Sequence, residues 1–186
     1  MSRLTARWPA ALGIAGALGA IVVIVSLDRE VQFFGPAVAL MAGIYLMAYA
    51  LGRPRAAWLA LAVLSVVVSV LHGLDAAGLL PIDPAVGMTI AAVVLWLWTV
   101  IRGRFADGAT FLVQTAGLAG FGAATLLIAA LEPRWALALA GLAFLAHGAW
   151  DAYHFRANKV VDRPYAEFCG VLDVLVGPAL IIAALV

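Results

Sequence analysis

The stretch LAHGAWDAYHFRANKVVDRPYAEFCGVLD, residues 145–173, decides the fold because it places a polar turn between two long apolar runs. It holds two of the three histidines, the only cysteine and the only lysine of the chain. It also holds four of the ten acidic residues, which are Asp151, Asp162, Glu167 and Asp173. Residues 135–144 and 174–186 on either side carry no charge. We therefore expect two membrane-spanning helices joined by a polar turn, with polar side chains carried into both helices.

The composition of the whole chain is typical of a membrane protein. Its 186 residues are 66% hydrophobic and 11% charged, which lies far outside the range of soluble globular domains. A net charge of +1 without a basic stripe predicts no nucleic-acid partner, so membrane lipids are the expected partners. A single cysteine excludes an internal disulfide and a cysteine-rich metal site.

Seven apolar runs are long enough to cross a hydrocarbon core of about 30 Å as helices. They cover residues 8–27, 31–51, 56–79, 84–101, 109–131, 134–154 and 165–186. The first run resembles a signal peptide, but it is long enough to span, so we expect a retained first helix. The breaks between runs are short, which makes neighbouring helices antiparallel. The prediction is an all-α, polytopic transmembrane bundle of seven spans that forms one membrane domain over residues 1–186.

The basic residues predict the orientation of these spans. With the N-terminus inside, nine basic residues fall on the cytoplasmic side: Arg3, Arg7, Arg53, Arg55, Arg102, Arg104, Arg156, Lys159 and Arg163. Only Arg29 and Arg134 fall outside. This bias predicts a cytoplasmic N-terminus and an external C-terminus in a bacterial cytoplasmic (inner) membrane.

A weak internal similarity relates residues 31–101 to residues 109–186. His72-Gly73 is echoed by His147-Gly148, and Pro54-Arg55 by Pro133-Arg134. Three helices in each copy would place the copies upside down relative to each other, which is the inverted repeat of many transporters. The predicted architecture is then one helix followed by two inverted three-helix repeats.

The first span carries small residues at four-residue spacing, namely Ala11, Ala15 and Gly19. Small residues let helix backbones approach closely in lipid. We expect this face to pack against another helix.

The polar residues of spans six and seven each share one face of their helix. They are His147, Asp151 and His154 in span six and Tyr165, Cys169 and Asp173 in span seven. At about 1.5 Å per residue, His147 and Asp173 both lie about 12 Å from the inner boundary, so we expect them to face each other. A second layer and then a rim should follow toward the cytoplasm: Asp151 with Cys169, then His154 with Glu167.

Two imidazoles and two carboxylates suit a divalent metal such as zinc, iron or manganese. The predicted ligands are His147, Asp151, His154 and Asp173, with Asp151 and Asp173 as the catalytic residues. A bound metal would activate water at this depth for a reaction on a lipid or another apolar molecule. The leading hypothesis is a small metal-dependent membrane enzyme.

Two other interpretations fit the same residues. His147 and Asp173 are also the groups of a proton or cation relay, which would indicate a small-solute transporter built on the inverted repeats. An Asp–His hydrogen bond that only locks two helices together would instead indicate a non-catalytic subunit or scaffold.

A second polar group lies near the outer end of span three. His72 and Asp75 follow Ser65 and Ser69, and Asp83 comes after the next turn. Serines in membrane helices usually bond to their own backbone or to a neighbouring helix. His72 and Asp75 are the candidate residues of an outer site, which would mirror the inner cluster if the repeat is real.

Two known classes of seven-span protein bear on this chain. A retinal protein is excluded because the only lysine, Lys159, lies in a predicted cytoplasmic loop. In span count and membrane depth the chain resembles the metal-dependent hydrolases related to adiponectin receptors and alkaline ceramidases. Span seven has no histidine, whereas those hydrolases have paired histidines on the last helix, so none of their ligands is carried over.

Overall fold

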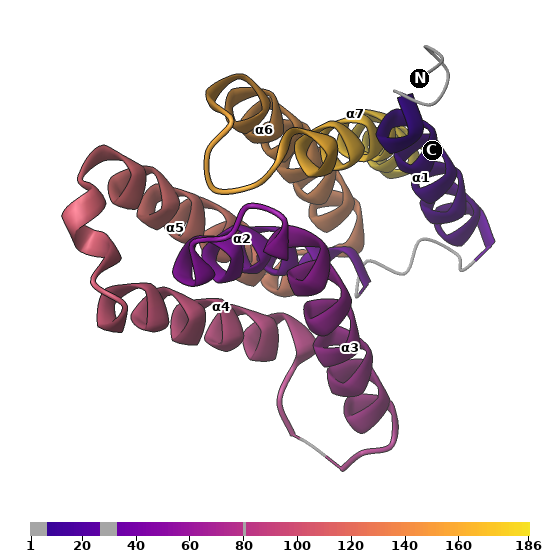
Figure 1. Ribbon diagram of the computed structural model, residues 1–186. Coiled ribbons are helices and arrows are strands. Elements are labelled where there is room, and N and C mark those ends of the chain that lie inside the picture. The colour runs from indigo at the N-terminus through magenta and orange to yellow at the C-terminus, as the bar shows by residue number, and fades with distance from the viewer. Residues whose placement is uncertain (1–6, 27–32, 80) are drawn as a thin grey trace.

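The computed structural model describes residues 7–26, 33–79 and 81–186. These residues form seven α-helices and a short 3-10 helix (Figure 1): α1 (Trp8–Ser26), α2 (Phe34–Leu51), α3 (Ala56–Ala76), α4 (Pro84–Ile101), η3 (Arg104–Asp107), α5 (Ala109–Ala130), α6 (Pro133–Ala157) and α7 (Arg163–Leu185). The prediction of an all-α protein is confirmed. Each predicted span matches one helix. The largest differences are three residues: α2 begins at residue 34 where 31 was expected, α3 ends at 76 where 79 was expected, and α6 ends at 157 where 154 was expected.

Six of the seven helices in the described part of the chain are long and apolar enough to cross a membrane. The exception is α6, although at 25 residues it is the longest helix. Its apolar character is lowered by His147, Asp151 and His154, which are all buried inside the protein. These three polar residues of α6 therefore face other helices and do not face the surroundings.

Helix α2 lies at the centre of the arrangement and packs against α3, α4, α5 and α6 (Figure 1). Most of its length, 78%, is buried. The outer helices expose large apolar side chains instead, for example Val66 on α3 and Leu112 on α5. An apolar exterior around a helical interior is the arrangement expected of a protein surrounded by lipid.

Glycines bring α6 and α7 into close contact. A Cβ atom added to Gly141 would lie 2.6 Å from the carbonyl oxygen of Gly177, so only glycine fits there. Seven residues away on each helix, a Cβ on Gly148 would lie 3.7 Å from the carbonyl oxygen of Gly170. The same interval on both antiparallel helices lets the backbones remain close over two turns. This approach places the polar residues of α6 next to α7.

Helix α1 packs against α7, but not through the predicted face. Its buried small residues are Gly13 and Ala17, and a Cβ on Gly13 would lie 2.5 Å from the Phe168 carbonyl oxygen. The predicted residues are exposed: Ala11, Ala15 and Gly19. That prediction is wrong because small residues recur at four-residue spacing on both sides of α1, so the spacing does not select a face.

The two predicted repeats pack differently. In the first, α2 packs extensively against α4, whereas the corresponding pair in the second, α5 and α7, makes no comparable contact. Conversely, α6 and α7 form the most extensive helix pair, whereas α3 and α4 touch only slightly. The predicted inverted repeat is therefore not confirmed.

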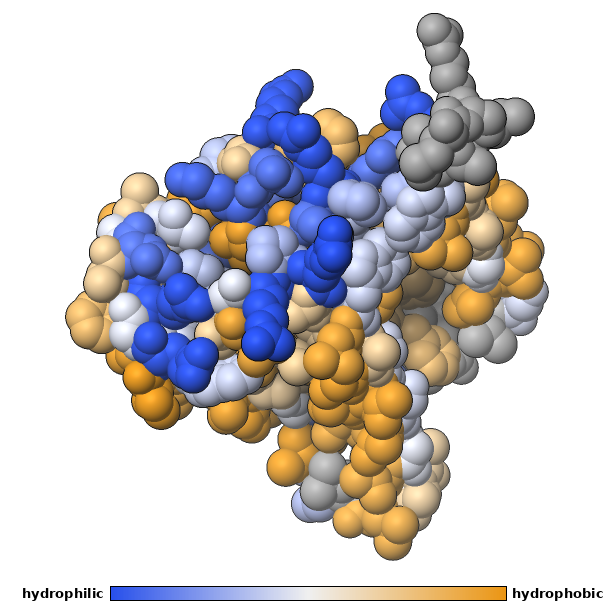
Figure 2. Space-filling model, viewed as in Figure 1, coloured by the Kyte–Doolittle hydropathy of each residue, from blue (hydrophilic) through white to orange (hydrophobic). Residues whose placement is uncertain are grey.

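The α2–α3, α4–α5 and α6–α7 connections meet at one end of the bundle, where Figure 2 shows hydrophilic residues gathered. A cleft of about 490 Å³ there is bounded by residues from all three connections, including Pro54, Arg104 and Lys159. We call this the basic end, and its residues are Arg53, Arg55, Arg102, Arg104, Arg156, Lys159 and Arg163. The flank formed by α3 is hydrophobic in the same view.

Candidate functional site

The centre of the site is the imidazole of His147, which lies between two carboxylates. Its Nδ1 atom lies 2.7 Å from Oδ2 of Asp173 and 3.3 Å from Oδ2 of Asp151. Asp151 is one turn further along α6, so helical spacing places it beside His147. Asp173 reaches the same nitrogen from α7 because the glycine contacts hold the two helices close. All three side chains are buried, with at most 1% of each residue exposed.

A third helix contributes Tyr45, which the sequence had not singled out. The Tyr45 hydroxyl, from the middle of α2, donates a hydrogen bond to Oδ1 of Asp151. Its ring also packs edge-on against His147, with the centroids 5.5 Å apart. The sequence does contain a feature that could have indicated Tyr45: it is a tyrosine in the middle of a span, and a buried tyrosine hydroxyl usually needs a hydrogen-bond partner.

No basic side chain other than His147 balances these carboxylates among the described residues. The remaining ion pairs are Arg7 with Glu167 and Arg104 with Asp107. Even a protonated His147 would leave one negative charge between Asp151 and Asp173 without compensation. Burial of uncompensated charge is costly, so the group needs an additional proton or a cation.

The donor atoms fit a metal ion. One atom from each of His147, Asp151 and Asp173 lies within 4.8 Å of the others. Tetrahedral coordination with bonds of about 2.0–2.2 Å places ligand atoms about 3.3–3.6 Å apart. The 3.3 Å separation of His147 and Asp151 already fits, whereas the 2.7 Å approach of His147 to Asp173 would have to widen. Oδ2 of Asp151 has no hydrogen-bond partner among the described residues, which leaves it available. One nitrogen and two oxygen ligands suit zinc, iron or manganese.

His154, the fourth predicted ligand, does not join this group. Its Nδ1 lies 2.9 Å from the carbonyl oxygen of Trp150, and its Nε2 lies 3.0 Å from the amide nitrogen of Gln114. A neutral ring that donates from Nδ1 and accepts at Nε2 satisfies both contacts, so neither nitrogen is free for a metal. Seven residues also separate His154 from His147 by about 10 Å along the helix. His154 is buried, and its ring is held against Gln114 of α5.

Two further residues of the predicted cluster, Cys169 and Glu167, do not belong to the His–Asp group. Cys169 is a buried free thiol that belongs to an apolar cluster with Tyr45 and Tyr165. Glu167 lies toward the basic end, where its carboxylate pairs with Arg7 at 3.2 Å. Cys169 is therefore a neighbour of the site, whereas Glu167 ties the start of α1 to α7.

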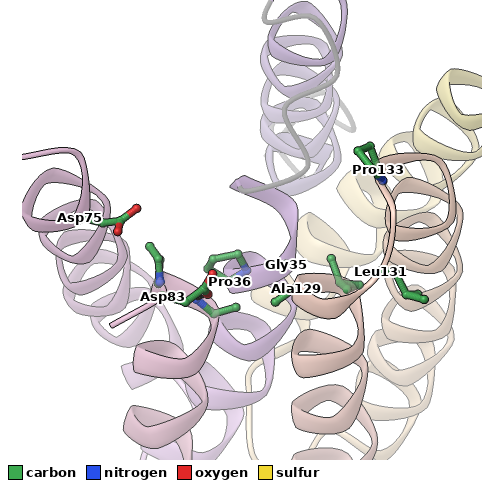
Figure 3. A pocket seen from close by; sticks show the side chains of 10 residues that line it. Gly35, Pro36, Asp75, Asp83, Ala129, Leu131 and Pro133 are labelled. Carbon is green, nitrogen blue, oxygen red and sulfur yellow. Dashed lines mark hydrogen bonds between the residues drawn. The ribbon is translucent and has the colours of Figure 1, made fainter. Parts of the chain in front are cut away.

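The predicted outer group does not assemble into one site. Asp75 and Asp83 line a cleft of about 180 Å³ at the end opposite the basic end (Figure 3). Asp83 is occupied as the N-cap of α4, since its Oδ1 accepts a hydrogen bond of 2.7 Å from the Ala85 amide. His72 does not line the cleft and packs on Phe33, with ring centroids 4.9 Å apart. The Ser69 hydroxyl bonds to its own helix, as expected for a membrane helix.

Fold and site together define an all-α protein of membrane type with a buried His–Asp cluster. No protein-family model, no curated protein and no solved structure matches the chain. The function must therefore be argued from the chemistry of the cluster and its surroundings.

Proposed function

We propose that the chain is an integral protein of a bacterial inner membrane with seven spans, a cytoplasmic N-terminus and an external C-terminus. Seven spans require that α6 also crosses the membrane. Its length supports this, and so does its place between α5 and α7, because the connections on both sides are short. Seven antiparallel spans would put the basic end on the cytoplasmic side, in agreement with the positive-inside rule.

Within this protein, His147, Asp151 and Asp173 bind one divalent metal ion, which is zinc, iron or manganese. The observation that carries the proposal is the approach of two carboxylate oxygens to one ring nitrogen in a buried site where the described residues place no basic side chain other than His147. A divalent cation would compensate both carboxylates and leave the site neutral. Tyr45 would then act on the metal indirectly, because its hydrogen bond fixes the orientation of Asp151.

The metal serves a reaction on a lipid or another apolar molecule. A metal with three protein ligands keeps a position for water or substrate, and it makes bound water a nucleophile near neutral pH. Asp151 and Asp173 would be the catalytic residues because each would hold the metal through its Oδ2 atom, while Oδ1 of Asp151 keeps its hydrogen bond from Tyr45. Without the metal, the contact between Nδ1 and Asp173 holds the His147 ring in place. The site lies well inside α6 and α7, so its substrate must come from the membrane.

A proton relay is the second candidate function. It is favoured by the unbroken series of contacts from Tyr45 through Asp151 and His147 to Asp173. A relay needs no metal, and the extra negative charge would be neutralised by a proton shared among these groups.

Metal analysis of the purified protein separates the two candidates. The metal proposal expects about one equivalent per chain, lost in His147→Ala and retained in His72→Ala, a histidine of α3 outside the site. Cobalt exchanged into the protein should give the visible absorption of a low-coordinate site, and the same variant should abolish it. Wild-type protein that carries no more metal than His147→Ala after growth with added zinc, iron and manganese would refute the metal site.

A further inference from the structure

A seam between α5 and α6 combines an apolar groove with a polar mouth. The groove, of about 460 Å³, is lined by small residues of both helices, among them Gly117, Gly120 and Ala146, and by Phe121 and Trp150. The nine residues of α5 from 116 to 124 are separated by eight steps of the helix, which correspond to a groove about 12 Å long. Its walls are the facing sides of two adjacent helices, so we take one acyl chain as its occupant.

The mouth follows the groove along the same two helices toward the basic end. This second cleft, of about 280 Å³, is lined by Thr110 and Gln114 of α5, by Tyr153 and His154 of α6, and by Lys159. The polar lining therefore begins where the apolar lining stops. A ligand that fills both clefts must have a polar head and an apolar tail.

Gln114, which lines the mouth, carries an acceptor without a hydrogen-bond partner in the described part of the chain. Gln114 is only 2% exposed, and its Oε1 has no hydrogen-bond partner in the described chain. The orientation of the amide is set by His154, because Nε2 of that ring requires the NH₂ group. A buried unpaired carbonyl is costly, so a ligand group that donates a hydrogen bond here gains free energy.

The same mouth offers a positive charge. Lys159 is exposed, lines the cleft and makes no ion pair within the described residues. An anionic group next to a hydroxyl would therefore meet Lys159 and Gln114 together. At the depth of the groove, the surroundings of α5 and α6 are hydrocarbon, so the tail is an acyl chain.

We propose that the α5–α6 seam binds a single-chain anionic lipid with a free hydroxyl, of the monoacyl phospholipid class. The acyl chain lies along Gly117 and Gly120, the hydroxyl donates to Gln114, and the phosphate pairs with Lys159. Phe121 forms the inner wall of the groove and packs edge-on against His147, with ring centroids 5.1 Å apart, so the chain lies one side chain away from the His–Asp cluster.

This inference rests on the membrane placement proposed above and names a substrate class for the same site, but it does not require a metal. The test therefore uses chelator-treated protein in nanodiscs of phosphatidylcholine. The probe is monoacyl phosphatidate with a brominated chain, which quenches tryptophan on contact. The signal of Trp150 is the difference between wild-type protein and Trp150→Phe. Saturable quenching of Trp150 is expected, without competition by inorganic phosphate.

Gly120→Leu is the decisive variant. A Cβ at Gly120 meets no heavy atom within 4 Å, so the backbone tolerates a side chain there, and a leucine directed into the groove should abolish saturable quenching. Gly19→Leu on α1 is the matched control, since Gly19 has equally open surroundings far from the seam in sequence and should leave quenching unchanged. Ala116→Leu provides a second block of the groove should Gly120→Leu fold poorly.

Head-group variants identify the polar contacts. Lys159→Met should weaken binding of the phosphatidate about fivefold, as expected for one exposed ion pair, and leave binding of brominated monoacylglycerol unchanged. Gln114→Leu should weaken both ligands about three- to tenfold. Equal quenching in Gly120→Leu and Gly19→Leu, or quenching no stronger than that by brominated phosphatidylcholine, would overturn the proposal. If the metal analysis shows no bound metal, the expected lipid binding is unchanged, because it is measured on chelator-treated protein.

Discussion

Nδ1 of His147 and Oδ2 of Asp173 lie 2.7 Å apart although 26 residues separate them in sequence. Each comes from a different helix, and the contact joins the most extensive helix pair of the fold. Whether or not the group binds a metal, this contact removes two polar side chains from apolar surroundings. It therefore has a measurable effect on stability.

Removal of one partner should be more harmful than removal of both. His147→Leu leaves two buried carboxylates without their shared donor and should lower the free energy of unfolding by about 3–5 kcal/mol. The double variant His147→Leu with Asp173→Leu should recover part of this loss, because one carboxylate leaves with the imidazole. Unfolding by denaturant in mixed micelles measures both. Strictly additive losses would show that the two side chains are not coupled.

Tyr45 should matter through Asp151. Tyr45→Phe removes the hydrogen bond to Oδ1 of Asp151 and should weaken metal binding about 10–100-fold, as for other groups that orient a metal ligand. Tyr49→Phe is the matched control on the same helix, since its hydroxyl bonds to the Arg104 carbonyl and to Asp107 at the basic end. Metal titration of the apoproteins gives the affinities. Equal effects of the two substitutions would argue against a role of Tyr45 at the site.

The glycine contacts should be sensitive to a single methyl group. In Gly141→Ala the new Cβ would lie 2.6 Å from the Gly177 carbonyl oxygen, so α6 and α7 must separate. We expect a loss of about 1–3 kcal/mol in stability, as for other overpacked contacts, together with weaker metal binding. Gly73→Ala on α3 meets no heavy atom within 4 Å and should not destabilise the protein. A harmless Gly141→Ala would mean that the helices are less closely packed than described.

The proposed orientation is open to chemical labelling. In a Cys169→Ala background, Glu132→Cys places a thiol in the α5–α6 connection, and Lys159→Cys places one in the α6–α7 connection. A membrane-impermeant maleimide added to intact cells should label position 132 only, whereas broken membranes should allow labelling of both positions. Labelling of position 159 alone in intact cells would show that the orientation is the opposite of the one proposed.

The helices could be predicted from the sequence because each is an apolar run bounded by charges or prolines, as at Pro84 and Pro133. The facing of His147 and Asp173 also followed from counting residues inward from one membrane boundary on two adjacent helices. Both inferences use only distances along a helix. Whether the pair binds a metal stays a prediction.

Relationships between distant helices could not be predicted in this way. Tyr45 reaches Asp151 only because α2 occupies the centre of the bundle, a position that no local pattern indicates. His154 shares a face with His147, yet α5 covers it and Gln114 engages its free nitrogen. The packing face of α1 could not be predicted for a related reason. Small residues lie on more than one side of α1, and only the close approach of α7 to Gly13 shows which side packs.

The polar interior of α6 has a consequence for how the protein is made. A lone helix with an aspartate inside its span enters a bilayer at a cost, which reaches about 2.5–3.5 kcal/mol for a residue at the helix centre. α7 begins only five residues after α6 ends (158–162), and it supplies the carboxylate that His147 contacts. We therefore expect the translocon to release α6 and α7 together as a hairpin. A nascent chain interrupted before residue 163 would display Asp151 to the lipid and become a substrate for membrane quality control.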